Sequence, residues 1–246
     1  MGHLFFQSAR PLVFAHRGGA GLAPENTVAA FDNGLRLGAD GLELDVRLSQ
    51  DGQVVVVHDR DLGRTTPLHG TVEAHAGQEL AYHGIPLLAG VLARYAATRI
   101  IVEMKVNSVQ CARAVVDVVR EAGAAERVCL GSFGLRALRA VRALAPSIAT
   151  SAAREEVRYA LYRSWCRWPV SRVCYGGYQV PELSGRTRVV SERFVRDAHQ
   201  AGLAVQVWTV DTVADARRLL AWGIDALITD RPDLIVPVVK ELVADR

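Results

Sequence analysis

The amino-acid sequence predicts an α/β fold, a (β/α)8 barrel that forms one domain over residues 1–246. Three observations predict it. Apolar, β-branched runs alternate with segments of helical periodicity, as they do in successive βα units. The length of 246 residues, 50% of them hydrophobic, is the usual size of a barrel of eight such units. Polar side chains also gather where the predicted strands end, which is where barrels carry their active sites.

Eight stretches are predicted to be the parallel strands of the barrel. They cover residues 12–16, 41–46, 99–105, 127–133, 147–152, 172–176, 204–210 and 225–230. Residues 53–59 follow the turn signal Asp51-Gly52, so this stretch is expected to return antiparallel to the second strand. Residues 60–84 have no clear periodicity and are expected to be a loop over the face that carries the polar groups, a short insertion after the second strand.

The segments between these strands contain residues that typically begin or end helices. They are Pro24 in a first turn and Gly38 at the end of that helix, Asn107 or Ser108 as a cap, and Ser191, Thr212 and Pro232 at three later starts. A doubly wound sheet is the competing architecture. Its dinucleotide fingerprint would have to begin at Gly19, but the third glycine position is then Pro24, so that alternative fails.

Composition excludes several classes of function. The 29 basic and 26 acidic residues leave a net charge of +3, too balanced to indicate a nucleic-acid partner. The four cysteines are scattered without a CxxC pair, which favours neither zinc nor disulfides and suggests a reduced cytoplasm. Residues 1–11 lack the apolar core of a signal peptide, and no stretch is long and apolar enough to span a membrane.

The polar residues at the strand ends have an informative spacing. Glu43 and Asp45 are two residues apart on a predicted strand, so both carboxylates leave the same face. Two carboxylates this close repel each other unless a cation lies between them. The predicted return places His58 opposite Glu43 or Asp45, and His16, which ends the first strand, can reach the same place.

A third pair, Glu103 and Lys105, ends the next parallel strand. Three carboxylates without cysteine favour a hard divalent cation, Mg²⁺ or Ca²⁺. Arg17 and Lys105 suit phosphate oxygens. Two histidines can supply a general acid and a general base near neutral pH, and the loop after His58 favours His58 as the acid. Cation, phosphate clamp and acid–base pair together predict phosphodiester cleavage.

The motifs in this order resemble those of the glycerophosphodiester phosphodiesterase family. They are His16-Arg17-Gly18, Pro24-Glu25-Asn26-Thr27, Glu43-Leu44-Asp45-Val46, Val57-His58-Asp59, Arg64-Thr65-Thr66, Glu103-Met104-Lys105, Ser132-Phe133, Val207-Trp208-Thr209-Val210 and Ile228-Thr229-Asp230-Arg231-Pro232. The resemblance implies a barrel of the phospholipase C-like phosphodiesterase type and an enzyme of lipid metabolism. It also implies a cation on Glu43, Asp45 and Glu103, catalysis by His16 and His58, phosphate on Arg17 and Lys105, and Trp208 beside the alcohol moiety.

The sequence departs from the family pattern at three places. The insertion is short over residues 67–84, Pro86-Leu87-Leu88-Ala89-Gly90 replaces the usual Pro-Thr-Leu-Glu-Glu and so loses a helix cap, and Asp211 replaces an asparagine. A trimmed insertion affects the identity of the substrate more than the catalysis.

Aromatic and basic residues alternate in the segment from Val157 to Trp168. Periodicity favours an outer barrel helix that packs an apolar stripe inward, which runs through Val157, Ala160, Leu161, Ser164, Trp165 and Trp168. The alternative is a surface that makes peripheral contact with lipid. Residues 176–190 are expected to be a lid or a loop without a role.

Three functions remain open. The first is a metal-dependent hydrolase of small glycerophosphodiesters that releases an alcohol and glycerol 3-phosphate. The second is a lysophospholipase D with the same chemistry on a lipid with one acyl chain, and the third is a barrel that binds phosphodiesters without cleaving them. The protein is expected to be a monomer or a homodimer.

Overall fold

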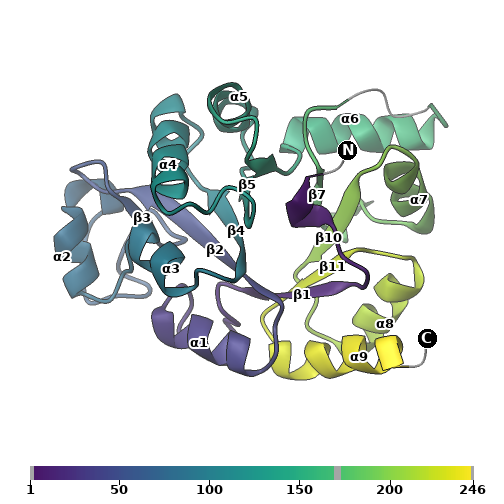
Figure 1. Cartoon of the computed structure of the whole chain (residues 1–246), viewed down its shortest axis with the longest axis horizontal. Coiled ribbons are helices and arrows are strands. Elements are labelled where there is room, and N and C mark those ends of the chain that lie inside the picture. Colours follow the sequence, from purple (N-terminus) through teal and green to yellow (C-terminus); the bar gives the residue numbers. More distant parts are fainter. Residues whose placement is uncertain (1–2, 169–172, 245–246) are drawn as a thin grey trace.

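The computed structural model describes residues 3–168 and 173–244, and it is a nearly closed parallel barrel surrounded by helices (Figure 1). The barrel strands are β1 (Leu12–His16), β2 (Gly41–Leu48), β4 (Arg99–Met104), β5 (Val128–Gly131), β6 (Ala149–Thr150), β7 (Gly177–Pro181), β10 (Ala204–Trp208) and β11 (Ala226–Thr229). Their order in the sheet is β6-β5-β4-β2-β1-β11-β10-β7, and a parallel bridge between Ser151 and Gly177 joins the two ends. The prediction of a (β/α)8 barrel is confirmed.

The helices between the strands mostly begin where the sequence predicted. They are α1 (Val28–Arg36), α3 (Leu88–Arg94), α4 (Val109–Glu121), α5 (Leu135–Leu144), α6 (Arg154–Trp165), α7 (Glu192–Gln200), α8 (Val213–Ala221) and α9 (Pro232–Ala244). Side chains of Ser108, Ser191 and Thr212 cap α4, α7 and α8. The placement of Pro24 in the first turn of α1 was wrong, because Thr27 caps that helix. The Thr27 hydroxyl donates to the carbonyl of Pro24, which holds Pro24 in the preceding turn.

Side chains alternate along each strand between the inside of the barrel and the helices outside. Two large buried clusters join the helices to the outer faces of the strands. A smaller cluster fills the barrel near the beginnings of the strands, where Phe14 and Ile101 meet Phe5 from the 3₁₀ helix η1 (Leu4–Phe6). Because this end of the interior is apolar and filled, the inward polar side chains are confined to the other end, where the strands finish.

The insertion after β2 has more structure than the sequence indicated. Its first strand, β3 (Val54–Val56), pairs antiparallel with β2, as predicted. The stretch 60–84, expected to be a loop, contains η2 (Val72–Ala74) and α2 (Gly77–Tyr82). Three of its residues, Leu62, Val72 and Leu80, close a small core with Val55, Val57 and Ile85. Scattered single apolar residues gave no periodic signal, although each is buried in this core.

The sixth predicted strand was misplaced. Arg172 lies outside the described residues, and Val173–Gly176 belong to no strand, whereas β7 begins at Gly177 and aligns with Ala204 of β10. The stretch 176–190 is therefore not a simple loop. It contains β7 and then a hairpin of β8 (Leu183–Ser184) and β9 (Thr187–Arg188). The Gly176-Gly177 pair looked like the end of a strand, but the alternation of buried Tyr178 and Val180 marks the true strand.

The apolar stripe predicted for α6 is only partly inward. Ala160, Leu161 and Ser164 are buried, whereas Trp165 and Trp168 are exposed. No helix in the ranges 3–168 and 173–244 is long and apolar enough to cross a membrane.

Candidate active site

All eight residues that the sequence singled out line one cavity of about 1160 Å³ at the ends of the strands. They are His16, Arg17, Glu43, Asp45, His58, Glu103, Lys105 and Trp208. The sheet explains why they meet. His16 of β1 is level with Glu43 of β2, and Asp45 is level with Glu103 of β4, so three neighbouring strands present their inward side chains together.

Asp45 lies at the centre of the polar contacts and is almost fully buried. Lys105 Nζ lies 2.9 Å from one carboxylate oxygen, and Arg17 Nε lies 3.1 Å from the other. Asn26 Nδ2 donates to the same carboxylate at 3.0 Å. Burial opposes ionisation, but Lys105 and Arg17 outweigh it and hold the pKa of Asp45 below its ordinary value.

Glu43 and Glu103 are in a different electrostatic condition. Burial, aided by the charge of Asp45, raises the pKa of Glu43 to about 7. Burial is also the main reason why the pKa of Glu103 rises to about 8, against the attraction of Lys105. Glu103 Oε1 is buried and has no hydrogen-bond partner among the described residues. The positive charge around these two carboxylates does not offset the effect of their burial.

The three carboxylates are oxygen donors, the kind that Mg²⁺ and Ca²⁺ take. Within the described part of the chain, no three histidine, cysteine, aspartate or glutamate side chains are already gathered as a metal cluster. The orphaned oxygen of Glu103 and the raised pKa values of Glu43 and Glu103 nevertheless fit a cation by their chemistry. A cation would supply the positive charge that these groups lack.

Each histidine is held by an aspartate through its Nδ1 atom. His16 Nδ1 lies 2.7 Å from Asp230 Oδ1, and His58 Nδ1 lies 2.6 Å from Asp59 Oδ1. A carboxylate only accepts hydrogen bonds, so each Nδ1 carries the proton in this arrangement. The Nε2 atom is then the nitrogen that exchanges protons. For His16 it lies 3.7 Å from Glu43 Oε2.

The surroundings shift the two histidines in opposite directions. Burial lowers the pKa of His16, but Glu43 and Asp230 outweigh it and raise the pKa above the ordinary value. Burial lowers the pKa of His58, and Asp59 does not compensate. Near neutral pH these directions favour His16 as the proton donor and His58 as the proton acceptor. The loop that follows His58 predicted the opposite assignment, with His58 as the acid.

A chain of ion pairs connects Arg17 to His58. Arg17 Nη1 lies 3.1 Å from Glu25 Oε1, and Arg64 Nη2 lies 2.6 Å from the same oxygen. Arg64 also pairs with Asp59 and lowers the pKa of that carboxyl to about 2, so it stays ionised beside His58. The Glu25 and Arg64 motifs were visible in the sequence without an assigned role. The structure shows that both fix the positions of other residues.

Two further residues of the site, Asp211 and Gly131, had no role assigned from the sequence. Asp211 accepts from the Thr229 hydroxyl at 2.9 Å and from the Asp230 amide at 2.7 Å, and so holds the loop that carries Asp230. Both bonds are donated to Asp211, which explains why aspartate serves in place of asparagine. Gly131 faces Glu103, and a Cβ atom there would lie 2.7 Å from Glu103 Oε2. No motif marks a glycine whose only role is to leave space.

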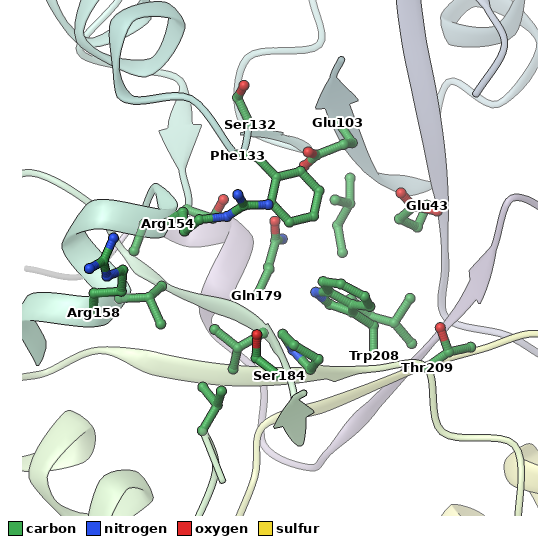
Figure 2. Close-up of a pocket in the computed structure, with 18 of the residues that line it drawn as sticks. Glu43, Glu103, Ser132, Phe133, Arg154, Arg158, Gln179, Ser184, Trp208 and Thr209 are labelled. Atoms are coloured by element: carbon green, nitrogen blue, oxygen red, sulfur yellow. The ribbon is translucent and has the colours of Figure 1, made fainter. Parts of the chain in front are cut away.

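Aromatic side chains separate the polar centre from the remainder of the cavity. The rings of Trp208 and Phe133 meet edge to face with centroids 6.0 Å apart. Lys105 Nζ lies 5.5 Å from the Phe133 ring centroid, and the Arg154 guanidinium lies 4.9 Å from it. In Figure 2, Arg154 and Arg158 lie to the left of Trp208, Glu43 lies to its right and Glu103 lies above it. Trp208 lines the same cavity as the polar groups, and its place beside the alcohol moiety stays a prediction.

Comparison with known proteins identifies relatives that cover almost the whole chain. The model of the glycerophosphoryl diester phosphodiesterase family matches residues 16–234. A glycerophosphodiester phosphodiesterase of Bacillus altitudinis is 31% identical, covering 94% of this chain and 98% of its own. The structure of an Agrobacterium tumefaciens glycerophosphodiester phosphodiesterase is 26% identical with a TM-score of 0.76, covering 92% and 99%. An Oleispira antarctica phosphodiesterase, solved with the product sn-glycerol-3-phosphate, is 26% identical with a TM-score of 0.73, covering 94% and 97%.

Proposed function

We propose that this chain, which belongs to the glycerophosphoryl diester phosphodiesterase family, hydrolyses glycerophosphodiesters to an alcohol and glycerol 3-phosphate. The observation that carries the proposal is the convergence of two aspartate-held histidines, Arg17, Lys105 and three buried carboxylates on one cavity. The Oleispira antarctica relative supports the product, since it was solved with sn-glycerol-3-phosphate.

We further propose that Glu43, Asp45 and Glu103 hold one divalent cation, Mg²⁺ or Ca²⁺. The support is the donor chemistry and the buried, unpartnered oxygen of Glu103. When bound, such a cation neutralises charge on the phosphate and makes a phosphodiester a better electrophile. Arg17 and Lys105 would orient the same phosphate and stabilise the charge that develops in the transition state.

The two histidines would divide the proton transfers. His58, with its lowered pKa, is neutral near pH 7 and accepts a proton from the attacking oxygen. His16, with its raised pKa, donates a proton to the departing alcohol. The attacking oxygen can belong to water or to the 2-hydroxyl of the substrate glycerol, which would give a cyclic phosphate first. Asp59 and Asp230 keep the rings oriented, so that each Nε2 presents the reacting nitrogen.

A lysophospholipase D is the second candidate, because the cavity continues past Trp208 between α6 and the hairpin β8–β9. The chemistry would be the same, but the substrate would carry one acyl chain. Contact with a lipid surface belongs to this candidate, since such a substrate is drawn from a membrane or micelle. A non-catalytic barrel is disfavoured, because every proposed catalytic group lines the cavity.

The deciding experiment measures hydrolysis of glycerophosphocholine before and after treatment with EDTA, followed by addition of Mg²⁺ or Ca²⁺. We expect turnover that is lost on chelation and restored by one of the two ions. Glu43→Gln and Glu103→Gln should each weaken cation binding in a titration as well as lower the rate. Full turnover after exhaustive chelation would refute the cation, and absence of turnover of both glycerophosphocholine and lysophosphatidylcholine under all conditions would refute the hydrolase.

A further inference from the structure

The cavity contains a second region that the proposed chemistry does not use. We call it the apolar groove. It lies between α6 and the hairpin β8–β9. Its apolar lining is Val157, Leu161, Tyr162, Trp165, Leu183 and Val189, and Arg158, Ser184 and Thr187 of the same two elements also border the cavity. Figure 2 shows Ser184 of the hairpin and Arg158 of α6 on the side of the view away from Glu43.

The cavity is larger than a small glycerophosphodiester needs. Its volume of about 1160 Å³ exceeds the roughly 300–1,000 Å³ of pockets that enclose drug-sized ligands. A glycerol phosphate with a small alcohol is smaller than such ligands and leaves part of this volume unfilled. The remaining volume is continuous with the space beside Arg17 and Lys105, so one ligand can extend from there into it.

The walls of the groove expose large apolar side chains to an unusual degree. Tyr162 is 56% exposed, Trp165 is 59% exposed and Leu183 is 52% exposed. Apolar side chains that gather on one exposed surface indicate a binding site. The side of α6 that packs against the rest of the protein includes small residues. Ala160 is buried, and the Ser164 hydroxyl donates to Asp197 Oδ2 of α7 at 2.6 Å, so the large rings of α6 are left facing the groove and its mouth.

The wall opposite α6 is held in place before any ligand binds. Glu182, at the base of the hairpin, pairs with Arg188 at 2.7 Å and with Arg218 at 2.7 Å. The Val189 amide donates to the Glu182 carbonyl at 2.9 Å and closes the hairpin. Because these contacts already hold the hairpin, a ligand can bind in the groove without first having to order it.

We propose that the apolar groove binds the single hydrocarbon chain of a phosphodiester lipid whose phosphate lies at Arg17 and Lys105. The continuity of the cavity indicates this occupant. One cavity joins the cationic side chains of Arg17 and Lys105 to the apolar groove, and a phosphodiester lipid has one charged end and one apolar end. The inference rests on the proposed function for the position of the phosphate, and it narrows the substrate class to glycerophosphodiesters with one long chain. Tyr159 and Trp165, exposed on α6, would contact the lipid interface from which the substrate comes.

The first test is a binding series that does not depend on turnover. Hexyl, octyl, decyl and dodecyl phosphocholine, each below its critical micelle concentration, are titrated into the protein by calorimetry. Burial of each added methylene should tighten binding by up to about fourfold, which corresponds to about 0.8 kcal/mol, until the chain outgrows the groove. The second test compares kcat/KM for glycerophosphocholine with kcat/KM for lysophosphatidylcholines of increasing acyl length.

Matched pairs of variants show where the hydrocarbon chain of the ligand binds. Leu183→Asp places a charge in the groove, whereas Leu4→Asp places the same charge at an equally exposed leucine, 53% exposed, on η1. Tyr162→Ala removes a groove ring, and Tyr82→Ala removes an exposed ring from α2. We expect Leu183→Asp and Tyr162→Ala to flatten the dependence of affinity on chain length by several-fold over the series. The two control variants should keep the wild-type slope.

The outcomes separate this inference from the proposed function. If glycerophosphocholine is hydrolysed but neither affinity nor kcat/KM depends on chain length, the groove inference is overturned and the hydrolase stands. A slope that survives unchanged in both groove variants also overturns it, because the chain then binds elsewhere. If no phosphodiester is hydrolysed while the slope appears and is lost in Leu183→Asp, the hydrolase fails and the chain-binding groove is supported.

Discussion

The polar region of the cavity and the apolar groove share one volume but are built in opposite ways. Strands β1, β2 and β4 supply the polar region, and its central carboxylate, Asp45, is held by Lys105, Arg17 and Asn26 together. One helix and one hairpin supply the groove, and its lining includes the exposed rings of Tyr162 and Trp165. Catalysis requires reacting groups fixed within a fraction of an ångström, whereas a hydrocarbon chain requires only area removed from water. The two regions should therefore differ sharply in their tolerance of substitution.

The largest expected effect is the loss of hydrolysis rate when either histidine of the polar region is removed. His16→Ala and His58→Ala should each slow glycerophosphocholine hydrolysis by roughly a hundredfold or more, the usual contribution of a positioned acid or base. The double variant should be little slower than either single variant, because each proton transfer needs the other group in place. Steady-state kinetics of the three variants check this. Near-normal rates in both single variants would refute the two-histidine mechanism.

The leaving group then tells the two histidines apart. A p-nitrophenolate group departs without protonation, so loss of the acid matters little when it is the leaving group. Because the pKa of His16 is raised and that of His58 is lowered, we expect His16→Ala to recover on p-nitrophenyl phosphodiesters and His58→Ala to remain slow. The reverse pattern would restore the assignment of His58 as the acid.

Removal of the phosphate clamp should have the next largest effect. Lys105→Ala should cost about 2–4 kcal/mol of transition-state stabilisation, the usual loss for one positioned electrostatic donor. The melting temperature should fall as well, because Lys105 pairs with the buried carboxylate of Asp45 and its loss leaves only Arg17 beside that charge, so folding is checked before the kinetics are compared. Lys240→Ala, at an exposed position on α9, is the matched control and should leave kcat/KM unchanged. A near-normal kcat/KM for Lys105→Ala would show that this lysine does not meet the phosphate.

Gly131→Ala tests how far the polar region tolerates the addition of a single methyl group. Gly131→Ala would place a Cβ atom 2.7 Å from Glu103 Oε2 and push that carboxylate out of position. We expect kcat/KM to fall about 10–100-fold, as when the surroundings of a metal ligand are disturbed, together with weaker cation binding. Gly90→Ala in α3 meets no atom within 4 Å and should leave activity intact while stabilising that helix by up to about 1 kcal/mol. Equal activities of the two variants would show that Glu103 can move without consequence.

The two regions also differ in how far the sequence could predict them. Every polar residue proposed for the site lines the cavity, because carboxylates and histidines at strand ends are conspicuous and parallel strands bring their ends together. The groove was not predictable in the same way. Trp165 follows the same helical spacing as the buried Leu161, so a pattern in one dimension cannot distinguish a ring that packs inward from one that faces a cavity.

The errors in the fold have a similar physical origin. Residues 173–176 looked like a strand because Val173 and Tyr175 favour strands, but the register with β10 begins at Gly177. The position of a strand in a barrel is set by the partner strand, which lies far away in the sequence. Gly131 and Asp211 were missed for a related reason, because each acts only on a neighbour that the fold brings close, Glu103 and Asp230 respectively.

The smallest expected effect concerns the tuning of His16 by Asp230. The hydrogen bond and the charge of Asp230 help to raise the pKa of His16 against the effect of burial. Asp230→Asn removes that charge, so the pKa of His16 should fall. If His16 must be protonated to act, the rate declines as the pH rises through its pKa. The descending limb of the plot of kcat/KM against pH should then move to lower pH, by about one unit for the loss of a neighbouring charge.

The ascending limb should stay in place, because it reports deprotonation of His58, whose aspartate partner is Asp59. Asp233→Asn is the matched control, since Asp233 pairs with Arg231 just after Asp230 but does not hydrogen-bond His16. It should leave both limbs unchanged. Movement of the ascending limb in Asp230→Asn would exchange the roles of the two histidines. An unchanged profile would show that Asp230 orients the ring without setting its charge, and the polar region would then depend on geometry more than on electrostatics.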